Sequence, residues 1–383
     1  MLVKELWRAF FFVCSLQFWR MALLWTFSIL FSYYQLFKAS LSQSQLFKPL
    51  IPENCPLFSY KLVSYPRCSP FTSSFRPVCV VTGATSGLGL AAAFELSKEG
   101  YVVVIVGRSQ QLLLETIRKI KDQNEDAHLK AFQVDLSSIE SVIKFKMSLQ
   151  QWLLDSELHC SIQILINNAG ILATSSRVTA DGYDQMIGTN YIGAFALTKL
   201  LLPLLKSSPV SSNIVNVTSF THRVVTDMQV DEGTVSGKRF LRSIRYPFAD
   251  IYEYSKLCLI LFSYELHRQL CLMGKSHQIC VTLADPGVVQ TNLMREVPRV
   301  LSWLAFCVLK RLRLLKSPEC GVDSIIDAAL APLGTSRAYF FGGKGRTINP
   351  SAVSQNAKLA RELWESTNNL LSITPLGAEG NDW

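Results

Sequence analysis

The stretch that decides the fold is Val78-Cys79-Val80-Val81-Thr82-Gly83-Ala84-Thr85-Ser86-Gly87-Leu88-Gly89. The apolar run at its start predicts a short buried strand, and the pattern from Leu88 to Leu96 predicts a helix. Glycine lets the connecting backbone turn sharply and approach a pyrophosphate, while the helix N-terminus offers unpaired N–H groups and a partial positive charge. A tight strand-to-helix turn without a ligand is the alternative. The position after a strand and before a helix favours a dinucleotide-binding turn.

The same alternation of apolar strands and helices continues along the chain. Further strands are expected at 102–106, 130–134, 162–166, 214–217 and 279–284, and helices at 110–121, 138–154, 183–205, around Tyr252, and at 357–371. Apolar strands that alternate with helices indicate a parallel sheet covered on both faces. We therefore expect an α/β fold with a doubly wound parallel sheet in a single domain.

The chain divides into four parts by composition. Residues 1–47 are rich in Trp, Phe and Leu, and Met21–Phe37 is an uncharged run that as a helix would be about 25 Å long, near the lower limit for crossing a bilayer. We expect a hydrophobic membrane anchor there. A cleaved signal peptide is the alternative, but the segment lacks a clear small-residue cleavage site, which argues against it. Residues 48–75 form a Pro-rich linker, 76–345 the α/β domain, and 346–383 a C-terminal helix and tail.

The formal net charge of +9 is concentrated near the N-terminus. The first 75 residues hold seven lysines and arginines against two glutamates, which favours a membrane surface over nucleic acid as the partner. The ten cysteines include no Cys-x-x-Cys motif and no Cys/His cluster at zinc spacing, so we interpret them as reduced thiols and expect no metal.

Polar residues follow the expected strands at the carboxyl edge of the sheet, where open α/β sheets bind ligands. Gly107-Arg108 follows the second strand, where NAD-binding folds usually carry an acid; Arg108 instead favours the 2′-phosphate of NADP(H), with a solvated arginine as the alternative. Asp135 follows the third strand and is either an adenine contact or a turn aspartate. The block Asn167-Asn168-Ala169-Gly170, then Ser219, then Asp285-Pro286-Gly287 follow the next three strands.

Tyr252 and Lys256 are four residues apart in an expected helix, so their side chains share one face. An adjacent ammonium favours the ionised phenol and lowers its pKa, which suits Tyr252 to proton exchange with an alcohol or carbonyl. A surface lysine on an ordinary amphipathic helix is the alternative for this pair alone.

Taken together, these motifs resemble the short-chain dehydrogenase/reductase family over Arg76 to Phe341. Three features are similar to the retinol dehydrogenase-like branch of this family. They are the long interval between Ser219 and Tyr252, the Gly107-Arg108 pair and the C-terminal helix. That branch includes the WW-domain oxidoreductase and the chloroplast translocon-associated dehydrogenase, although no WW domain is present in this sequence.

The resemblance implies a Rossmann-like domain, an NADP(H) cofactor and four catalytic residues. Ser219 would polarise the substrate oxygen, Tyr252 would exchange the proton, Lys256 would lower the tyrosine pKa and bind the nicotinamide ribose, and Asn190 would hold a water of a proton relay. The cofactor site implied by the family consists of Thr82, Gly83, Ser86, Gly87, Leu88, Gly89, Arg108, Asp135, Leu136, Asn167, Ala169, Gly170, Tyr252, Lys256, Pro286, Gly287 and Thr291.

Two segments depart from the family pattern or extend it. The insert Thr221–Asp250 is rich in arginine, and we interpret it as a solvated basic loop. The apolar stretch Val300–Leu309, followed by Lys310, Arg311, Arg313 and Lys316, suits the interface of an anionic membrane, with a core helix as the alternative. We expect it to form an apolar lid through which a lipid-like substrate enters.

The resulting prediction is an NADP(H)-dependent oxidoreductase that interconverts a carbonyl and an alcohol on an isoprenoid, retinoid-like or steroid-like substrate at a membrane. A non-catalytic NADP(H)-binding scaffold that acts through protein partners is the alternative. We expect no nucleic-acid partner and leave a homodimer open. The endoplasmic reticulum, with the catalytic domain facing the cytosol, is the expected location, and a plastid envelope is the alternative.

Overall fold

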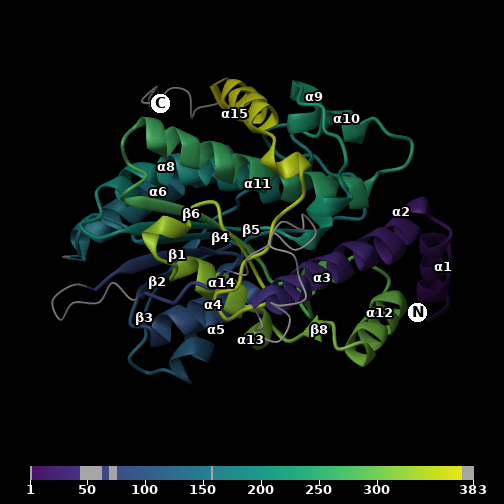
Figure 1. Ribbon diagram of the computed structural model, residues 1–383, viewed down its shortest axis with the longest axis horizontal. Helices are drawn as coiled ribbons and strands as arrows, with labels where there is room; N and C mark the ends of the chain where they lie inside the picture. The colour runs from purple at the N-terminus through teal and green to yellow at the C-terminus, as the bar shows by residue number, and fades with distance from the viewer. Residues whose placement is uncertain (1, 44–62, 69–75, 157, 373–383) are drawn as a thin grey trace.

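A parallel sheet of seven strands forms the centre of the protein in the computed structural model, which describes residues 2–43, 63–68, 76–156 and 158–372 (Figure 1). Its strand order is β3-β2-β1-β4-β5-β6-β9, and every neighbouring pair is parallel. The strands are β1 (Val78–Thr82), β2 (Val102–Gly107), β3 (His128–Gln133), β4 (Ile164–Asn167), β5 (Ser212–Val217), β6 (Ile279–Asp285) and β9 (Tyr339–Phe341). The order reverses between β1 and β4, which places a ligand crevice at the carboxyl ends of these two strands.

Helices cover both faces of the sheet because side chains alternate along each strand. Val78 and Val80 of β1 belong to one apolar core, and Cys79 and Val81 belong to the other. The first core is closed by α6 (Ile139–Asp155), α8 (Gly193–Lys206) and α11 (Phe248–Leu272), and the second by α4 (Gly87–Lys98), α5 (Gln110–Lys121) and α14 (Asp323–Ala329). The expected doubly wound fold is confirmed.

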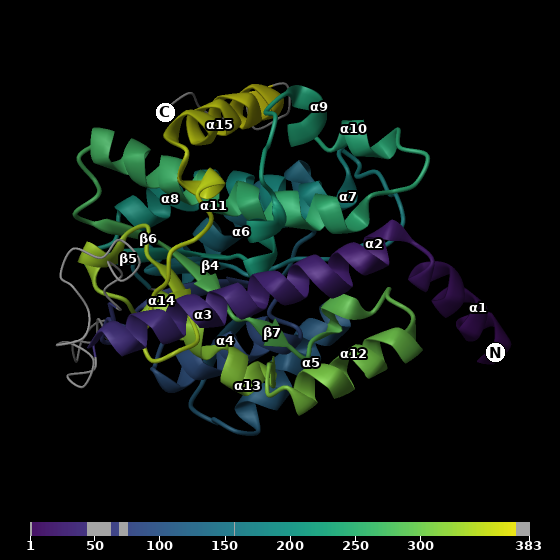
Figure 2. The same ribbon diagram turned by 45° about the vertical axis from the view of Figure 1, so that its right-hand side comes forward.

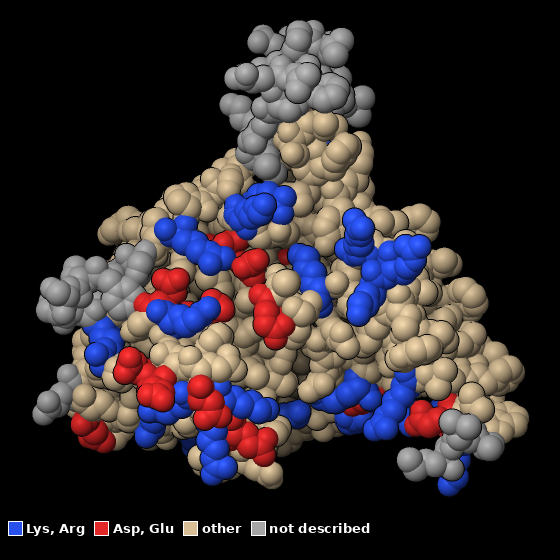
Figure 3. Space-filling model, turned by 90° about the horizontal axis from the view of Figure 1, so that it is seen from below, with Lys and Arg blue, Asp and Glu red and all other residues tan. Residues whose placement is uncertain are grey.

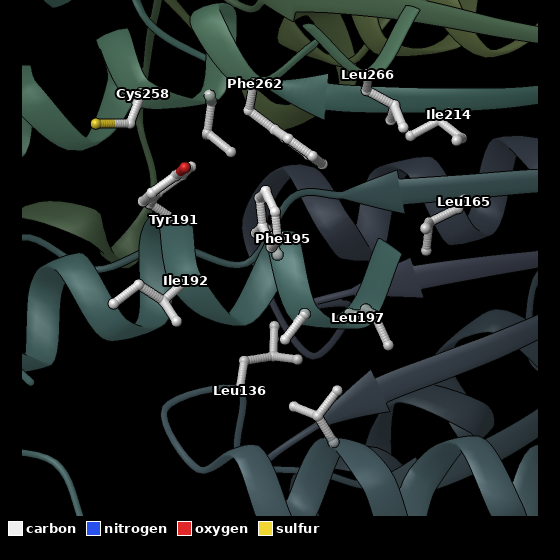
Figure 4. Packing of buried hydrophobic residues seen from close by; sticks show 14 of the residues in the cluster. Leu136, Leu165, Tyr191, Ile192, Phe195, Leu197, Ile214, Cys258, Phe262 and Leu266 are labelled. Carbon is white, nitrogen blue, oxygen red and sulfur yellow. The ribbon is translucent and has the colours of Figure 1, made fainter. Parts of the chain in front are cut away.

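Aromatic side chains join α8 to α11 within the first core. Figure 4 shows Phe195 pointing toward Phe262, and their ring centroids are 5.0 Å apart. Trp364 of α15 (Ala357–Ser372) contacts both rings, at 5.1 Å from Phe195 and 6.0 Å from Phe262. The C-terminal helix predicted at 357–371 therefore packs on α11, the helix that carries Tyr252.

The structure refines two expected elements and adds a strand. The helix predicted at 183–205 consists of α7 (Gln185–Ile187), the π-helical turn η3 (Gly188–Ile192) and α8. Strand β3 begins two residues earlier than predicted. Strand β9 was not predicted; it is only three residues long and pairs with β6, so its apolar side chains carry no periodic signal.

Shorter elements connect the main ones. They are η4 (Phe220–Val224), α9 (Glu232–Val235), α10 (Lys238–Leu241), β7 (Val288–Val289), η5 (Asn292–Met294), α12 (Arg299–Arg311), β8 (Leu315–Lys316), α13 (Pro318–Gly321), η6 (Leu333–Thr335) and η7 (Val353–Gln355). Strands β7 and β8 form a small parallel pair that holds the return from α12 to the domain.

The N-terminal segment is helical and lies along the α/β domain (Figures 1 and 2). It comprises α1 (Leu2–Val13), α2 (Leu16–Trp19), the π-helical turn η1 (Arg20–Trp25) and α3 (Thr26–Gln43). Ile29 is 1 % exposed and packs with Phe220, Leu283 and Phe341 of the domain. The expected N-terminal helix is present, and one of its faces is covered by protein.

One helix of the described chain is long and apolar enough to span a membrane, and a bent pair of helices is so only if its two parts count as one span. The pair is Lys4–Val13 and Leu16–Leu41, bent by 72° at its break. The single helix is Gln185–Lys206, whose apolar window is 89 % buried, as in the core helix of a soluble protein.

Part of the expected linker packs on the domain. Tyr65 N–H donates to the carbonyl of Gly345, and Arg67 pairs with Asp327 at 2.7 Å. The rest of the predicted linker, 48–62 and 69–75, lies outside the described residues, as does the tail after Ser372.

Candidate active site

The glycine turn after β1 is built for close backbone packing. Gly83 has a φ of +64°, a conformation that side chains disfavour, and a Cβ at Gly89 would lie 2.3 Å from the Gly83 carbonyl oxygen. Only glycine therefore allows α4 to begin directly above the turn. The helix N-terminus points its unpaired N–H groups into the crevice, as expected for a phosphate site.

Thr82 and Asn167 support this crevice from behind. Thr82 Oγ1 accepts from the N–H groups of Asn168 and Ala169 at 2.9 and 3.0 Å, which joins β1 to the loop after β4. Asn167 Nδ2 donates to Thr198 and Asn216. Neither side chain lines the cavity described below; both hold together the strands that form its floor.

Tyr252, Lys256 and Ser219 are close together at the carboxyl edge of the sheet. Lys256 Nζ lies 5.6 Å from the centroid of the Tyr252 ring and donates to the Val217 carbonyl at the end of β5 at 3.0 Å. Ser219, two residues after β5, interacts with the Tyr252 hydroxyl. The spacing of four residues on α11 places the phenol and the ammonium on one face, as the sequence predicts.

Asn190 is buried next to this group in η3. Its Oδ1 accepts from Ile171 N–H at 2.8 Å, and its Nδ2 donates to the Ile171 carbonyl and to Ser255. A Cβ placed at Gly170 would lie 3.5 Å from both Asn190 Oδ1 and Lys256 Nζ. Both polar groups therefore border the space that Gly170 leaves open, and the role of Asn190 in a water relay stays a prediction.

Burial dominates the protonation of the two titrating groups. It raises the pKa of the Tyr252 phenol, with the Asp285 carboxyl adding to this effect and Ser219 opposing it. The sequence predicted the opposite direction, and Lys256 is not among the causes of the shift. Burial also lowers the pKa of Lys256 to about 8, which the Asp285 carboxyl partly offsets. At neutral pH the phenol keeps its proton and the lysine keeps its charge, so Tyr252 is in the form of an acid.

A buried network behind Ser219 was not predicted from the sequence. His222 Nδ1 donates to the Ser219 carbonyl at 2.7 Å, because Nε2 accepts from the Ser351 N–H at 3.0 Å. Asp285 accepts from the Tyr339 hydroxyl and from Gly287 N–H, each at 2.8 Å. These bonds fix the backbone on either side of the catalytic edge.

A cavity of about 650 Å³ contains the predicted site. Fourteen of its predicted residues line it: Gly83, Ser86, Gly87, Leu88, Arg108, Leu136, Ala169, Gly170, Ser219, Tyr252, Lys256, Pro286, Gly287 and Thr291. The other five lie outside the lining: Thr82, Gly89, Asp135, Asn167 and Asn190. Thr189 and Thr221 also line it, and within the described chain their buried hydroxyls have no hydrogen-bond partner and can bind a ligand.

Arg108 and Asp135 differ in their availability. The exposed Arg108 lines the cavity at the end of β2. The Asp135 carboxylate accepts from the backbone and hydroxyl of Ser137 at 2.9 and 2.7 Å, so one of its oxygens already serves a turn. The observed contacts are those of the turn aspartate, and an adenine contact stays a prediction.

The other end of the cavity is apolar. Its side chains come from two elements far apart in sequence: Phe12, Phe18, Met21, Trp25 and Ile29 from the N-terminal segment, and Leu301, Leu304, Phe306, Val308 and Leu309 from α12. The insert 221–250 contributes only Thr221 to the lining, so it does not cover the site. The N-terminal residues were missed because the sequence marked them only as apolar.

Comparison with known proteins shows which family this chain belongs to. A family model described as short chain dehydrogenase matches residues 77–230. The chain is 32 % identical over 312 residues to polyprenol dehydrogenase of Homo sapiens, which covers 77 % of this chain and 85 % of that protein. This chain belongs to the short-chain dehydrogenase family. Retinol dehydrogenase 13 of Homo sapiens is 30 % identical over 298 residues, covering 77 % and 84 % of the two chains.

The family assignment agrees with the fold of a solved structure. An uncharacterised protein from Mycobacterium paratuberculosis superposes with a TM-score of 0.60 and 26 % identity, covering 80 % of this chain and 97 % of that one. As a member of the short-chain dehydrogenase family, the chain is an oxidoreductase that acts on CH–OH groups, and its similarity to polyprenol and retinol dehydrogenases confirms the expected retinol dehydrogenase-like branch.

Proposed function

We propose that this short-chain dehydrogenase uses NADP(H) to interconvert a carbonyl and an alcohol on an isoprenoid, retinoid-like or steroid-like substrate at a membrane. The observation that carries the proposal is the two-ended cavity. Ser219, Tyr252 and Lys256 line it together with the glycine turn and Arg108 at one end and apolar side chains at the other.

The residues at the polar end fit a dinucleotide. The glycine turn and the N-terminus of α4 would hold the pyrophosphate, and Arg108 would pair with a 2′-phosphate. Lys256 would bind the nicotinamide ribose. When bound, the nicotinamide supplies or accepts the hydride.

The chain's own hydroxyls handle the proton and the substrate oxygen. Ser219 would donate a hydrogen bond to that oxygen, and Tyr252, held neutral by burial, would protonate it in the reductive direction. Lys256 is charged below about pH 8 and would stabilise the phenolate that remains. In the oxidative direction, the Tyr252 phenolate would instead accept the proton of the alcohol, and Ser219 and Lys256 would keep the same roles.

Exposed apolar side chains around the cavity support action at a membrane. Trp7, Phe10 and Phe11 of α1, Phe27 and Phe31 of α3, and Trp303, Leu304 and Val308 of α12 are all exposed. Figure 3 shows, on one face of the molecule, a broad area without charged side chains beside an area where lysines and arginines are interspersed with acidic residues. Aromatic residues next to basic ones suit a headgroup interface. We propose that these helices lie in the interface of the endoplasmic reticulum, with the domain in the cytosol.

The experiment is cofactor binding and turnover by the full chain in non-ionic detergent. We expect tighter binding of NADPH than of NADH and turnover of at least one isoprenoid, retinoid or steroid carbonyl. Tyr252→Phe should lower kcat by about a hundredfold or more, because it removes the proton donor, and should weaken NADPH binding far less, because the ring and the other residues of the cofactor site remain. Tight NADPH binding without turnover on any member of the panel would favour the scaffold instead.

A further inference from the structure

The N-terminal segment forms one wall of the active-site cavity. Its lining residues Phe18, Met21, Trp25 and Ile29 recur every three or four positions and so share one helix face. Trp19 lies in the same segment but is 50 % exposed and does not line the cavity. The segment therefore has an inner face toward the substrate and an outer face away from the protein.

Glu253, the residue after the catalytic tyrosine, holds this wall in place. Its carboxylate is fully buried; Oε1 accepts from Trp25 Nε1 at 2.7 Å, and both oxygens accept from Arg20 Nε at 3.0 Å. Arg20 also pairs with Asp250 at 3.2 Å, one turn earlier on α11. Gln17 Oε1 accepts from Ala249 N–H, which caps the start of the same helix.

These contacts stabilise the charges of Arg20 and Glu253, which apolar surroundings would otherwise disfavour. Arg20 interrupts an apolar segment, and Glu253 lies on a buried part of α11. Burial raises the pKa of Glu253, and its bonds to Arg20 and Trp25 oppose that effect. A buried carboxylate requires such partners, so docking of the N-terminal segment satisfies a group adjacent to the catalytic tyrosine.

Trp25 also packs on the catalytic ring itself. The centroids of the Trp25 and Tyr252 rings are 5.6 Å apart, at an interplanar angle of 41°. Because the indole N–H is bonded to Glu253, the ring is fixed in this orientation. The indole therefore occupies space in the cavity directly beside the phenol, the group that would meet the substrate oxygen.

We propose that Trp25 is a specificity-determining residue of the active site, and that Arg20 and Glu253 are the residues that position it. The proposal rests on the carbonyl–alcohol chemistry inferred above. By limiting the room beside Tyr252, Trp25 favours aldehydes and primary alcohols over ketones and secondary alcohols. The N-terminal segment is thus part of the substrate site as well as of the membrane-facing surface.

The test compares two substrates that differ by one methyl group. The full chain in detergent micelles, with NADPH, is assayed on farnesal and on the ketone in which a methyl group replaces the aldehyde hydrogen. Trp25→Ala should raise the ketone-to-aldehyde ratio of kcat/KM at least about tenfold, within what one well-fitted methyl group can contribute. Trp19→Ala, the exposed control, should leave the ratio unchanged. A ratio within twofold of the wild type in Trp25→Ala would overturn the proposal.

The positioning role has its own variant. Glu253→Gln keeps an acceptor for the indole but loses the charge that holds Arg20, so the ratio should shift in the same direction by a smaller factor. Combined with Trp25→Ala it should add nothing, because both changes act through one ring. Glu265→Gln is the matched control: Glu265 is a buried glutamate on α11 paired with Arg268, away from the cavity. Additive effects of Trp25→Ala and Glu253→Gln would contradict positioning.

A binding measurement separates this proposal from the proposed function. The two compounds are titrated into NADPH-saturated Tyr252→Phe protein with and without Trp25→Ala, which requires no turnover. Gain of ketone affinity relative to aldehyde supports the role of Trp25 even if the wild type turns over neither compound, an outcome that would remove only the proposed reaction. Unchanged relative affinity would overturn the role of Trp25 whatever the turnover.

Discussion

Arg108 illustrates what one residue at a strand end contributes. It lines the cavity at the carboxyl end of β2, where a carboxylate would repel a 2′-phosphate. Arg108→Gln should weaken NADPH binding by about ten- to a hundredfold, as expected for loss of a charge-assisted pair, and should leave NADH binding nearly unchanged. Fluorescence titration of both cofactors measures this. Equal weakening of both would show that Arg108 does not select the cofactor.

The buried His222 should make the free energy of unfolding depend on pH. Burial lowers its pKa from the ordinary 6.5 to about 3, with the nearby Arg223 adding to the effect and the bond to Ser219 opposing it. Between these values the unfolded chain binds a proton that the folded protein does not, so the unfolding free energy falls as the pH falls from 6.5.

His222→Gln removes this dependence. The variant should be less stable than the wild type by about 1–3 kcal/mol at pH 7.5, because the bond to the Ser219 carbonyl is lost. The difference should shrink by up to about 1.4 kcal/mol for each pH unit below 6.5. Chemical denaturation at pH 7.5, 5.5 and 4.5 measures both quantities, and a difference that stays constant would contradict the neutral histidine.

In helix α12, some apolar side chains line the cavity and others are exposed, a distinction that the apolar sequence alone does not show. Phe306 lines the cavity, whereas Trp303 is 63 % exposed and does not line it. Phe306→Ser should lower kcat/KM for long isoprenoid aldehydes several-fold more than for short ones, because it removes apolar contact with the chain. Trp303→Ser should leave that ratio unchanged in detergent. The reverse pattern would place α12 in another orientation.

The N-terminal segment shows why an apolar run has more than one structural outcome. Hydropathy describes how much of a helix avoids water, and both a bilayer and a protein surface satisfy it. The signal that could have indicated docking is Arg20, between the uncharged stretches 9–19 and 21–37, together with Glu253 next to the predicted catalytic tyrosine. Each charge needs a partner, and they pair with each other.

In the whole molecule, the basic residues in the last turn of α12 and just after it should make membrane binding sensitive to charge. Lys310, Arg311 and Arg313 are exposed, whereas Lys316 turns inward over the Phe341 ring at 5.9 Å. Lys310→Ser combined with Arg311→Ser should weaken binding to phosphatidylserine vesicles about tenfold or more, at about 1 kcal/mol for each basic residue. Vesicle flotation measures this.

The controls for this prediction are lipid composition and a distant pair of lysines. Binding to phosphatidylcholine vesicles should change little, because only anionic headgroups attract the lost charges. Lys119→Ser with Lys121→Ser on α5 should behave like the wild type. Equal loss from these variants would show a dependence on total charge instead of on this surface.

The sequence by itself determined the parallel α/β fold, because strand and helix periodicities and the glycine turn are local patterns. It also predicted Ser219, Tyr252 and Lys256, since each lies at a strand end or on one helix face that the fold brings to a common edge. The side chains that surround them, in contrast, depend on tertiary packing. Trp25 and Tyr252 are over 200 residues apart, and their contact depends on how the N-terminal helix docks. The direction in which the Tyr252 pKa shifts also depends on tertiary packing. Burial, a property of the packed molecule, raises this pKa and outweighs any effect of Lys256.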